Sequence, residues 1–133
     1  MRTAISFSRH PLVTNQVEYH PFLDQSALLA AANATGLSVM AYCGMAVGRV
    51  FKNPKLEEIA ARNGRTIAQI VLRWLIQQPG VVALSRTENL ERIPENTRVF
   101  DFELSNEDMQ AITRLRTVGS RIVNPVHLAP VWD

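Results

Sequence analysis

Short apolar runs alternate with amphipathic stretches along this chain, and the alternation predicts strands and helices in repeated order. Three apolar runs, at residues 12–17, 37–42 and 81–84, have the length of strands. The third run is wholly apolar, as expected of a parallel strand that is covered on both sides. Between the second and third runs, apolar side chains recur at helical spacing, and they are Ile67, Ile70, Val71, Trp74 and Leu75.

Residues that start or end helices support this assignment. Gly36 follows the first amphipathic stretch, at a position where a left-handed C-cap favours glycine. Pro54 stands where the first turn of a helix accepts proline, and Pro94 must lie at the start of a helix or at a break. Ser105 precedes the last helix, and the acid of Asp108 lies at the third position of a capping box.

The order strand, helix, strand, helix, strand, helix, with short links, predicts an α/β protein with a parallel sheet. Three strands are too few to close an eight-stranded barrel. The chain is therefore either a small open sheet or a piece of a larger fold. Residues 117–133 contain two prolines and show no clear period, so we expect an ordered loop there.

The composition indicates which cellular compartment and which class of binding partner to expect for this protein. The chain of 133 residues is 47% hydrophobic and 20% charged, which is ordinary for one globular domain. Its formal charge of +2 comes from scattered basic residues, whereas a nucleic-acid binder usually gathers them into one stripe. A single cysteine, Cys43, excludes an internal disulfide, and no apolar run approaches the roughly 20 residues that span a bilayer. We therefore expect a cytoplasmic protein that binds neither nucleic acid nor membrane.

Three segments together resemble the aldo-keto reductase family. Residues 13–21 (VTNQVEYHP) are similar to the signature on the sixth barrel strand of that family. Residues 82–96 are similar to its final strand and following helix, and residues 99–105 to the entry of its last barrel helix. The resemblance implies that residues 1–133 form the C-terminal half of a (β/α)8 TIM barrel, with about the last three βα units. In that case the chain begins within the fifth barrel helix and runs to the natural C-terminus.

The same resemblance leaves this chain without a catalytic residue. Aldo-keto reductases use a tetrad of Asp, Tyr, Lys and His, in which the Tyr is the general acid toward the carbonyl oxygen. All four positions come before the segment that this chain matches. Two interpretations stay open. The chain belongs to an NADP(H)-dependent reductase of small carbonyl compounds whose other half lies elsewhere, or it is a non-catalytic nucleotide-binding or assembly remnant.

The resemblance also implies an NADP(H) site, and the nicotinamide end of that site falls on two strand ends. Gln16 matches the glutamine that hydrogen-bonds the carboxamide, and its side chain offers both a donor and an acceptor. Tyr42 matches the tyrosine that stacks on the nicotinamide ring. Cys43, Gly44 and Met45 begin the loop in which the family commonly has serine, proline and leucine, so the serine hydroxyl contact is lost or replaced by a weaker thiol. Taken alone, Gln16 is also explained as a polar residue that satisfies backbone groups, and Tyr42 as a core or rim side chain.

The adenosine end of the implied site falls on the third strand and the helix after it. Arg86, Thr87 and Arg92 match the family's binding site for the adenosine 2'-phosphate. Guanidinium groups pair with phosphate oxygens through charge-assisted, often bidentate hydrogen bonds. Glu95 and Asn96 match positions near the adenine. Without the surrounding motif, the two arginines are more simply explained as charges on a solvated helix surface.

The histidines do not indicate a metal site. The spacing of His10, His20 and His127 matches no ligand motif, and we interpret all three as non-catalytic.

The C-terminal end suggests a branch of the family and a substrate contact. Residues 128–133 (LAPVWD) resemble the bacterial branch that includes 2,5-diketo-D-gluconate reductases. C-terminal loops of this family shape the substrate pocket, which makes Trp132 a candidate substrate residue. A three-stranded piece of a barrel has two open edges, so we also expect self-association or contact with a missing N-terminal half.

Overall fold

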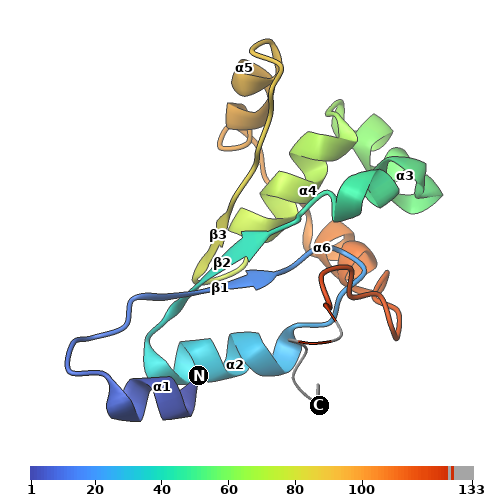
Figure 1. The fold of residues 1–133 in the computed structure, drawn as a ribbon. Helices are drawn as coiled ribbons and strands as arrows, with labels where there is room; N and C mark the ends of the chain where they lie inside the picture. The colour runs from blue at the N-terminus through green and yellow to red at the C-terminus, as the bar shows by residue number, and fades with distance from the viewer. Residues whose placement is uncertain (126, 128–133) are drawn as a thin grey trace.

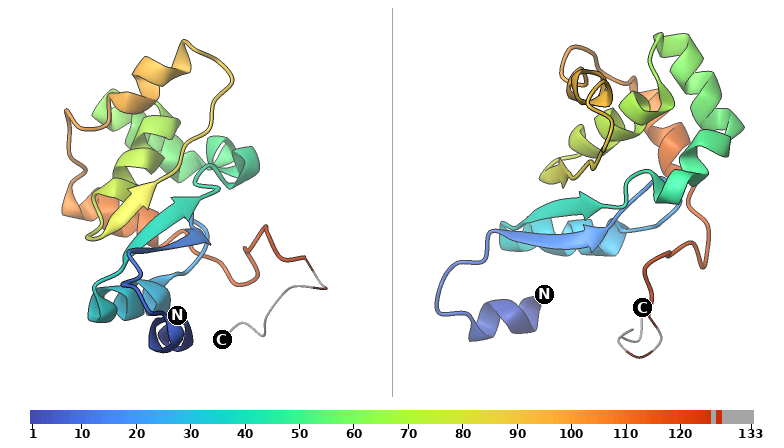
Figure 2. Two further views of the ribbon diagram at one scale, coloured as in Figure 1. Left: turned by 60° about the vertical axis from the view of Figure 1, so that its left-hand side comes forward. Right: turned by 45° about the horizontal axis from the view of Figure 1, so that its top comes forward.

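The computed structural model describes residues 1–125 and 127, and these residues form a three-stranded sheet with helices packed against it (Figure 1). Two further views show α1 and α5 at opposite ends of the molecule (Figure 2). Along the described chain the elements are α1 (Arg2–Phe7), β1 (Thr14–Glu18), α2 (Ser26–Thr35), β2 (Ser38–Tyr42), the 3-10 helix η1 (Ala46–Lys52), α3 (Pro54–Asn63), α4 (Ile67–Ile76), β3 (Val81–Ala83), α5 (Arg92–Thr97) and α6 (Asn106–Thr113).

The sheet has the order β1-β2-β3, and both pairs of neighbours are parallel. This confirms the predicted α/β class and the parallel arrangement. The observed β1 starts two residues later than the predicted strand at 12–17 and also includes Glu18. Its start is Thr14 because that residue is the register partner of Ser38, where β2 begins, so earlier residues have no strand opposite them. The other two strands are each one residue shorter than predicted.

The two faces of the sheet differ in burial, because helices cover only one of them. Val39 and Ala41 of β2 are fully buried and pack in the core with side chains of α2, α3 and α4. The alternate positions of β2, Met40 and Tyr42, are only half-buried. Side chains of neighbouring parallel strands that are in register point to the same face. The open face therefore also carries Gln16, the register partner of Met40.

The core lies between the covered face of the sheet and the helices. Its fully buried side chains come mainly from α3, α4 and α6, which keep their apolar residues at helical spacing. The largest of them are Trp74, Leu56, Ile59, Ile70, Leu75 and Ile112.

The predicted helix ends are largely confirmed. Gly36 ends α2 in the left-handed conformation, with a φ of 71°. Pro54 occupies the first turn of α3, and Asn53 before it accepts backbone hydrogen bonds as the N-cap. Pro94 lies in the first turn of α5, which begins at Arg92.

The capping box predicted at the start of α6 is only half formed. The Ser105 hydroxyl accepts the Asp108 N–H at 3.1 Å, as an N-cap should. The Asp108 carboxylate does not bond back to the cap. It accepts hydrogen bonds from Arg62 and Asn63 of α3 instead, and so joins α6 to α3. A tertiary partner has therefore replaced the local one.

Two absences apply to the residues that the structure describes. Among residues 1–125 and 127, no helix is long and apolar enough to cross a membrane. Within the same residues, no three His, Cys, Asp or Glu side chains gather in a way that would hold a metal ion.

Candidate functional site

Two adjoining grooves run along the carboxyl ends of β2 and β3. The first has a volume of about 830 Å³ and follows the end of β2, with the lining residues Tyr42, Cys43, Gly44, Met45, Val47, Leu84, Ser85 and Arg86. The second has a volume of about 500 Å³ and lies against the segment after β3, with Thr66, Ile67, Ala68, Phe51, Thr87, Arg92, Glu95 and Asn96 in its wall. Met45, Ser85 and Arg86 line both grooves, which makes them one continuous surface.

The predicted nucleotide residues gather along this surface. Four of them, Tyr42 to Met45, line the first groove. Five others line the second, and they are Arg86, Thr87, Arg92, Glu95 and Asn96. Segments that lie more than forty positions apart in the sequence are therefore brought to one side of the molecule because parallel strands end at the same edge of a sheet.

The loop after β2 is tightly curved where it lines the first groove. Cys43, Ala46 and Val47 all have positive φ, and the φ of Val47 is 52°. This conformation is unusual for any residue with a side chain and strained for a β-branched one. Gly44 meets a different constraint, because a Cβ there would lie 3.0 Å from Leu75 Cδ1. A glycine at this position lets the loop backbone lie against α4.

Tyr42 at the end of β2 and Cys43 at the start of this loop are both neutral near neutral pH. Burial raises the pKa of the Tyr42 phenol, and the nearby Glu18 carboxylate raises it further. Burial likewise raises the pKa of the Cys43 thiol. A protonated thiol is a poor nucleophile, so Cys43 is better suited to packing in this loop than to covalent chemistry.

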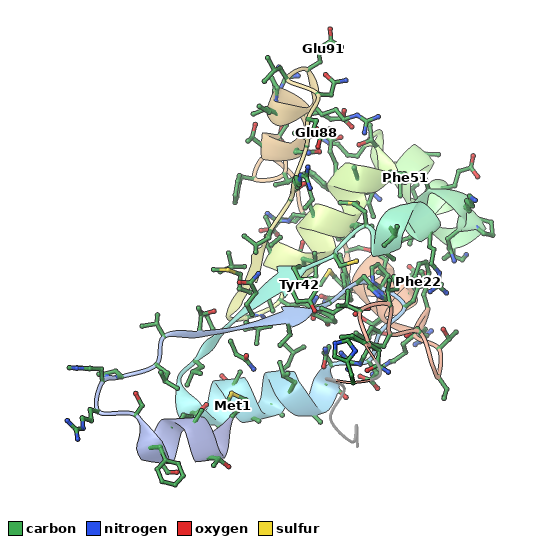
Figure 3. All side chains as sticks on the ribbon, in the orientation of Figure 1. Met1, Phe22, Tyr42, Phe51, Glu88 and Glu91 are labelled. Carbon is green, nitrogen blue, oxygen red and sulfur yellow. The ribbon has the colours of Figure 1, made fainter. Side chains whose placement is uncertain are left out.

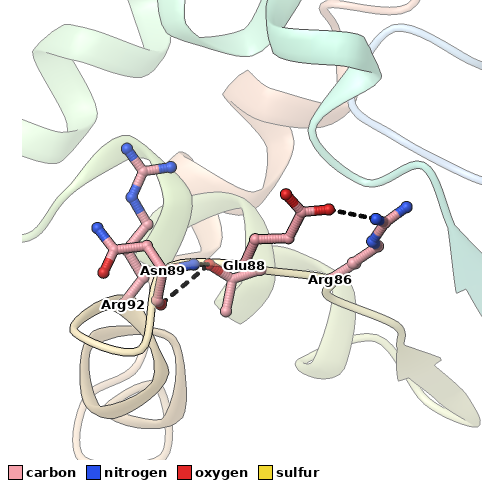
Figure 4. Close-up of a pocket in the computed structure, with 5 residues that line it drawn as sticks. Arg86, Glu88, Asn89 and Arg92 are labelled. Atoms are coloured by element: carbon pink, nitrogen blue, oxygen red, sulfur yellow. Dashed lines mark hydrogen bonds and ion pairs between the residues drawn. The ribbon is translucent and has the colours of Figure 1, made fainter.

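The arginine end of the surface is open to solvent. Arg86, Thr87, Glu88, Asn89 and Arg92 line a shallow depression of about 440 Å³ (Figure 4). Arg86 pairs with Glu88 across this depression, and both side chains are more than four-fifths exposed, at 86% and 82%. An exposed ion pair of this kind contributes little to stability, so Arg86 can exchange Glu88 for another anion at small cost.

The segment from Thr87 to Asn89 is shaped by local hydrogen bonds. The Thr87 hydroxyl accepts the Asn89 N–H and donates to the Asn89 carbonyl, both at 3.2 Å. The Asn89 side chain in turn accepts the Glu91 N–H at 2.9 Å. These bonds turn the chain from β3 into α5, so that Arg92 at the start of α5 returns to the same depression as Arg86.

Glu95 and Asn96 line the groove but also hold α5 in place. The Glu95 carboxylate accepts the Thr66 hydroxyl at 2.7 Å, and the Glu95 carbonyl accepts the Gln69 side-chain amide at 3.0 Å. Both partners belong to the N-terminal end of α4. Asn96 donates to the Ser85 hydroxyl at 3.3 Å. These bonds connect α5 both to α4 and to the end of β3.

The tenth predicted nucleotide residue, Gln16, lies outside both grooves. It is exposed on the open face of the sheet, beside Met40 rather than beside Tyr42. Gln16 thus lies two residues before Glu18, the last residue of β1. Trp132, the predicted substrate residue, lies outside the described residues.

Sequence reasoning missed Glu18, a buried carboxylate at the end of β1. Its side chain is fully buried, and its two oxygens accept the backbone N–H groups of Ile122 and Val123 at 2.7 Å each. His20 provides a third contact, at 3.0 Å from Nε2 to Oε1. A signal was present in the sequence, because an acid at the end of an apolar strand must find partners when it is buried.

His20 has no free nitrogen with which to act as an acid or base. It is 0% exposed, and its Nδ1 accepts the Phe22 N–H at 3.3 Å. The proton therefore lies on Nε2, which donates to Glu18. Burial lowers the pKa of His20, so the ring is neutral. These contacts give His20 a structural role, while His10 and His127 are exposed.

A sequence profile of the aldo/keto reductase family matches residues 5–117, which is most of the chain. The chain belongs to the aldo/keto reductase family. This confirms the resemblance carried by the strand and helix motifs.

Several aldo/keto reductases and related proteins are similar to most of this chain. An aldo-keto reductase of Mycolicibacterium smegmatis is 39% identical over 86% of the chain and 40% of its own length. The glyoxal reductase of Bacillus subtilis is 40% identical over 79% of the chain and 37% of its own length. The aldose reductase B of Dictyostelium discoideum is 35% identical over 97% of the chain and 42% of its own length. The chain thus spans less than half the length of these relatives.

Solved aldo/keto reductase structures share the fold. A protein described as a "putative 2,5-diketo-D-gluconic acid reductase B" superposes with a TM-score of 0.96 at 48% identity, over 99% of this chain and 47% of that one. A mutant of the protein Gox0644 in complex with NADPH superposes with a TM-score of 0.85 at 30% identity, over 91% of this chain and 44% of its own. The three-stranded parallel sheet therefore corresponds to part of a TIM barrel, as predicted.

Proposed function

We propose that this chain is the NADP(H)-binding, C-terminal half of an aldo/keto reductase that reduces small carbonyl compounds to alcohols. The observation that carries the proposal is the continuous surface formed by the two grooves. It holds an aromatic ring and a curved backbone loop at one end and two arginines at the other. An extended dinucleotide has the matching pattern, since it is an aromatic ring joined through phosphates to a nucleoside.

The chemistry of each end fits a different part of NADP(H). Tyr42 offers an uncharged aromatic face for the nicotinamide ring. Arg86 and Arg92 offer guanidinium groups for the 2'-phosphate, and Glu95 and Asn96 lie beside them in the groove wall. When bound, NADPH would supply the hydride. Gln16 lies outside the grooves, and we propose that its amide reaches the carboxamide across the open face of the sheet.

The related proteins support the cofactor and the substrate class. The Gox0644 mutant is in complex with NADPH, and its chain superposes on most of this one. One relative is a glyoxal reductase by its name, and one similar solved structure is described as a "putative 2,5-diketo-D-gluconic acid reductase B". We therefore propose small aldehydes and diketones as substrates of the complete protein, and we propose that it belongs to the branch that includes 2,5-diketo-D-gluconate reductases. The single cysteine agrees with a cytoplasmic location.

We propose that the proton donor for carbonyl reduction comes from residues outside this chain. Near the ring end, the phenol of Tyr42 has a raised pKa, and His20 is buried with both nitrogens engaged. The lining of the first groove contains no lysine. These side chains suit holding a cofactor better than delivering a proton to a substrate.

NADPH fluorescence provides a direct test of the proposed cofactor. Adding the purified chain to NADPH should raise and shift the nicotinamide emission, because the ring moves from water into the groove beside Tyr42. Tyr42→Ala should weaken the binding that this change reports by about two- to tenfold, since a stacked aromatic contact contributes about 0.5–1.5 kcal/mol. A matched control is Tyr19→Phe, which alters a tyrosine that lies against Trp74, away from the grooves. An emission spectrum that stays unchanged at saturating protein would contradict the proposal.

We also propose that the open face of the sheet is covered in solution, by a second copy or by the other half of the barrel. Val82 and Leu84 of this face are 46% and 41% exposed, and Val47 and Phe51 nearby are 76% and 50% exposed. Such patches favour association, as do the outer edges of β1 and β3, which pair with no other strand among the described residues. Light scattering of the isolated chain at micromolar concentration should therefore give the mass of a dimer or larger species. A monodisperse monomer would contradict this prediction.

A further inference from the structure

The end of β1 and the C-terminal tail, here residues 117–125, form a buried contact that is separate from the two grooves. Glu18 accepts consecutive N–H groups of this tail, those of Ile122 and Val123, one on each carboxylate oxygen. Consecutive amides that converge on one carboxylate form a small anion-binding concavity. The tail therefore binds the carboxylate with two of its backbone amides.

A second attachment point lies a few residues earlier in the tail. The Phe22 carbonyl, in the connection after β1, accepts the Thr117 N–H at 2.9 Å. The same carbonyl accepts the Ser120 hydroxyl, and Ser120 is 4% exposed. Residues 117–123 are thus attached at both ends to the segment that runs from Glu18 to Phe22.

This contact lies next to the Tyr42 end of the first groove. Glu18 is the register partner of Tyr42, and the Tyr19 N–H donates to the Tyr42 carbonyl at 3.0 Å. Figure 3 shows Tyr42 at the end of β2 with Phe22 in the neighbouring connection. The guanidinium of Arg49, from η1, lies 5.5 Å from the centre of the Phe22 ring. The tail, the end of β1 and the loop that lines the groove therefore meet here.

We propose that Glu18 is a positioning residue that holds the C-terminal tail beside the Tyr42 end of the groove. A buried carboxylate is costly unless hydrogen bonds compensate for its lost hydration. Three N–H donors compensate Glu18, and the tail supplies two of them. Release of the tail would remove two of these donors and leave the His20 contact in place. Burial of the Glu18 charge and docking of the tail are therefore coupled, whichever ligand the groove binds.

Amide hydrogen exchange, read residue by residue by NMR, tests this role in the intact chain. Glu18→Gln keeps the shape of the side chain but replaces one acceptor oxygen with an NH2 donor and removes the charge. The Ile122 and Val123 amides should exchange about ten- to a hundredfold faster in this variant, as expected for the loss of charge-assisted hydrogen bonds. Their proton resonances should also move upfield. Amides of β2, such as that of Ala41, should keep their protection.

A control and a second variant distinguish a role of Glu18 in holding the tail from a general role in the core. Glu57→Gln changes an exposed acid on α3 and should leave the tail amides unchanged. Val123→Pro removes the Val123 N–H donor and leaves the Glu18 side chain unchanged. Because Val123 is 45% exposed, the core should tolerate this substitution. The Ile122 amide should then lose protection as it does in Glu18→Gln.

Two outcomes would overturn the proposal. In the first, a folded Glu18→Gln or Val123→Pro variant keeps full protection at Ile122. In the second, protection falls equally at the tail and in β2, which would make Glu18 a residue of the whole core. If Glu18→Gln does not fold, the Val123→Pro comparison decides alone, because it leaves the buried carboxylate unchanged.

Discussion

Replacing Arg92 with alanine should weaken NADP(H) binding about tenfold and leave NAD(H) binding almost unchanged. The two cofactors differ by one 2'-phosphate, so only groups that contact this phosphate can discriminate between them. A hydrogen bond to a charged group contributes about 1.5–3 kcal/mol, or roughly ten- to a hundredfold in affinity. Arg92 and Arg86 are exposed, and solvent screening places the expected loss at the low end of that range.

Arg86→Ala should show the same selectivity with a smaller loss. Arg86 is already paired with Glu88, so binding a phosphate requires that it give up this partner. Glu88→Gln should therefore strengthen NADP(H) binding slightly, because it frees Arg86 and removes a negative charge from the depression.

Titration calorimetry of both cofactors against each variant measures this selectivity. Arg98→Ala is a matched control, since Arg98 follows α5 but lies outside the lining of both grooves. Equal losses for NADP(H) and NAD(H) would show that the arginines support the fold rather than read the phosphate. Unchanged affinity for both would leave them as surface charges, and the cofactor assignment would then depend on Gln16 and Tyr42.

The isolated chain should show no NADPH-dependent reduction of an aldehyde or a diketone. A positioned general acid contributes about 10²–10⁴-fold to such reactions, and each donor to the developing oxyanion about 10²–10³-fold. We expect the catalytic tetrad of the family to precede this segment, as the resemblance implies, and His20 is occupied by Glu18 and Phe22. Cofactor binding alone brings the reactants together without providing the proton.

A spectrophotometric assay of NADPH consumption, with glyoxal as the substrate, checks this prediction. The glyoxal reductase of Bacillus subtilis is a suitable positive control, being 40% identical over 79% of the chain. Turnover above background that disappears in Tyr42→Phe would show that the proton donor lies within this chain. The same assay distinguishes a half enzyme from a non-catalytic remnant, because only a half enzyme should gain activity when the rest of the barrel is added.

Local sequence patterns predicted the three strands and most of the helices of this protein, in the order that the structure shows. The spacing of Ile67, Ile70 and Trp74 predicts α4, and Gly36 and Pro54 mark helix ends that the structure shows. These features depend on residues within a turn or two of one another, so a local pattern is sufficient to predict them. The parallel arrangement follows from the same patterns, because short strand-helix-strand links leave few other topologies.

Sequence also placed most of the candidate site, through the resemblance rather than through periodicity. The local sequence around Arg86 and Arg92 does not distinguish arginines of a phosphate site from arginines on a solvated surface. The structure brings them to one depression, and it shows that Glu95 bonds α4 as well as lining the groove. A family motif predicts which residues face a ligand, but not which of them also hold the fold.

Only the tertiary structure decided where the polar groups of β1 and α6 find their partners. Asp108 bonds α3 instead of its own cap, Gln16 stays on the open face, and Glu18 binds amides 104 and 105 positions away. The sequence alone does not show whether a carboxylate is hydrogen-bonded to water, to the N-terminus of its own helix or to a distant backbone amide. The partner of a buried carboxylate depends on which distant segments pack against it in the folded chain. The free energy of burying its charge therefore depends on the groups that tertiary packing brings within hydrogen-bond distance.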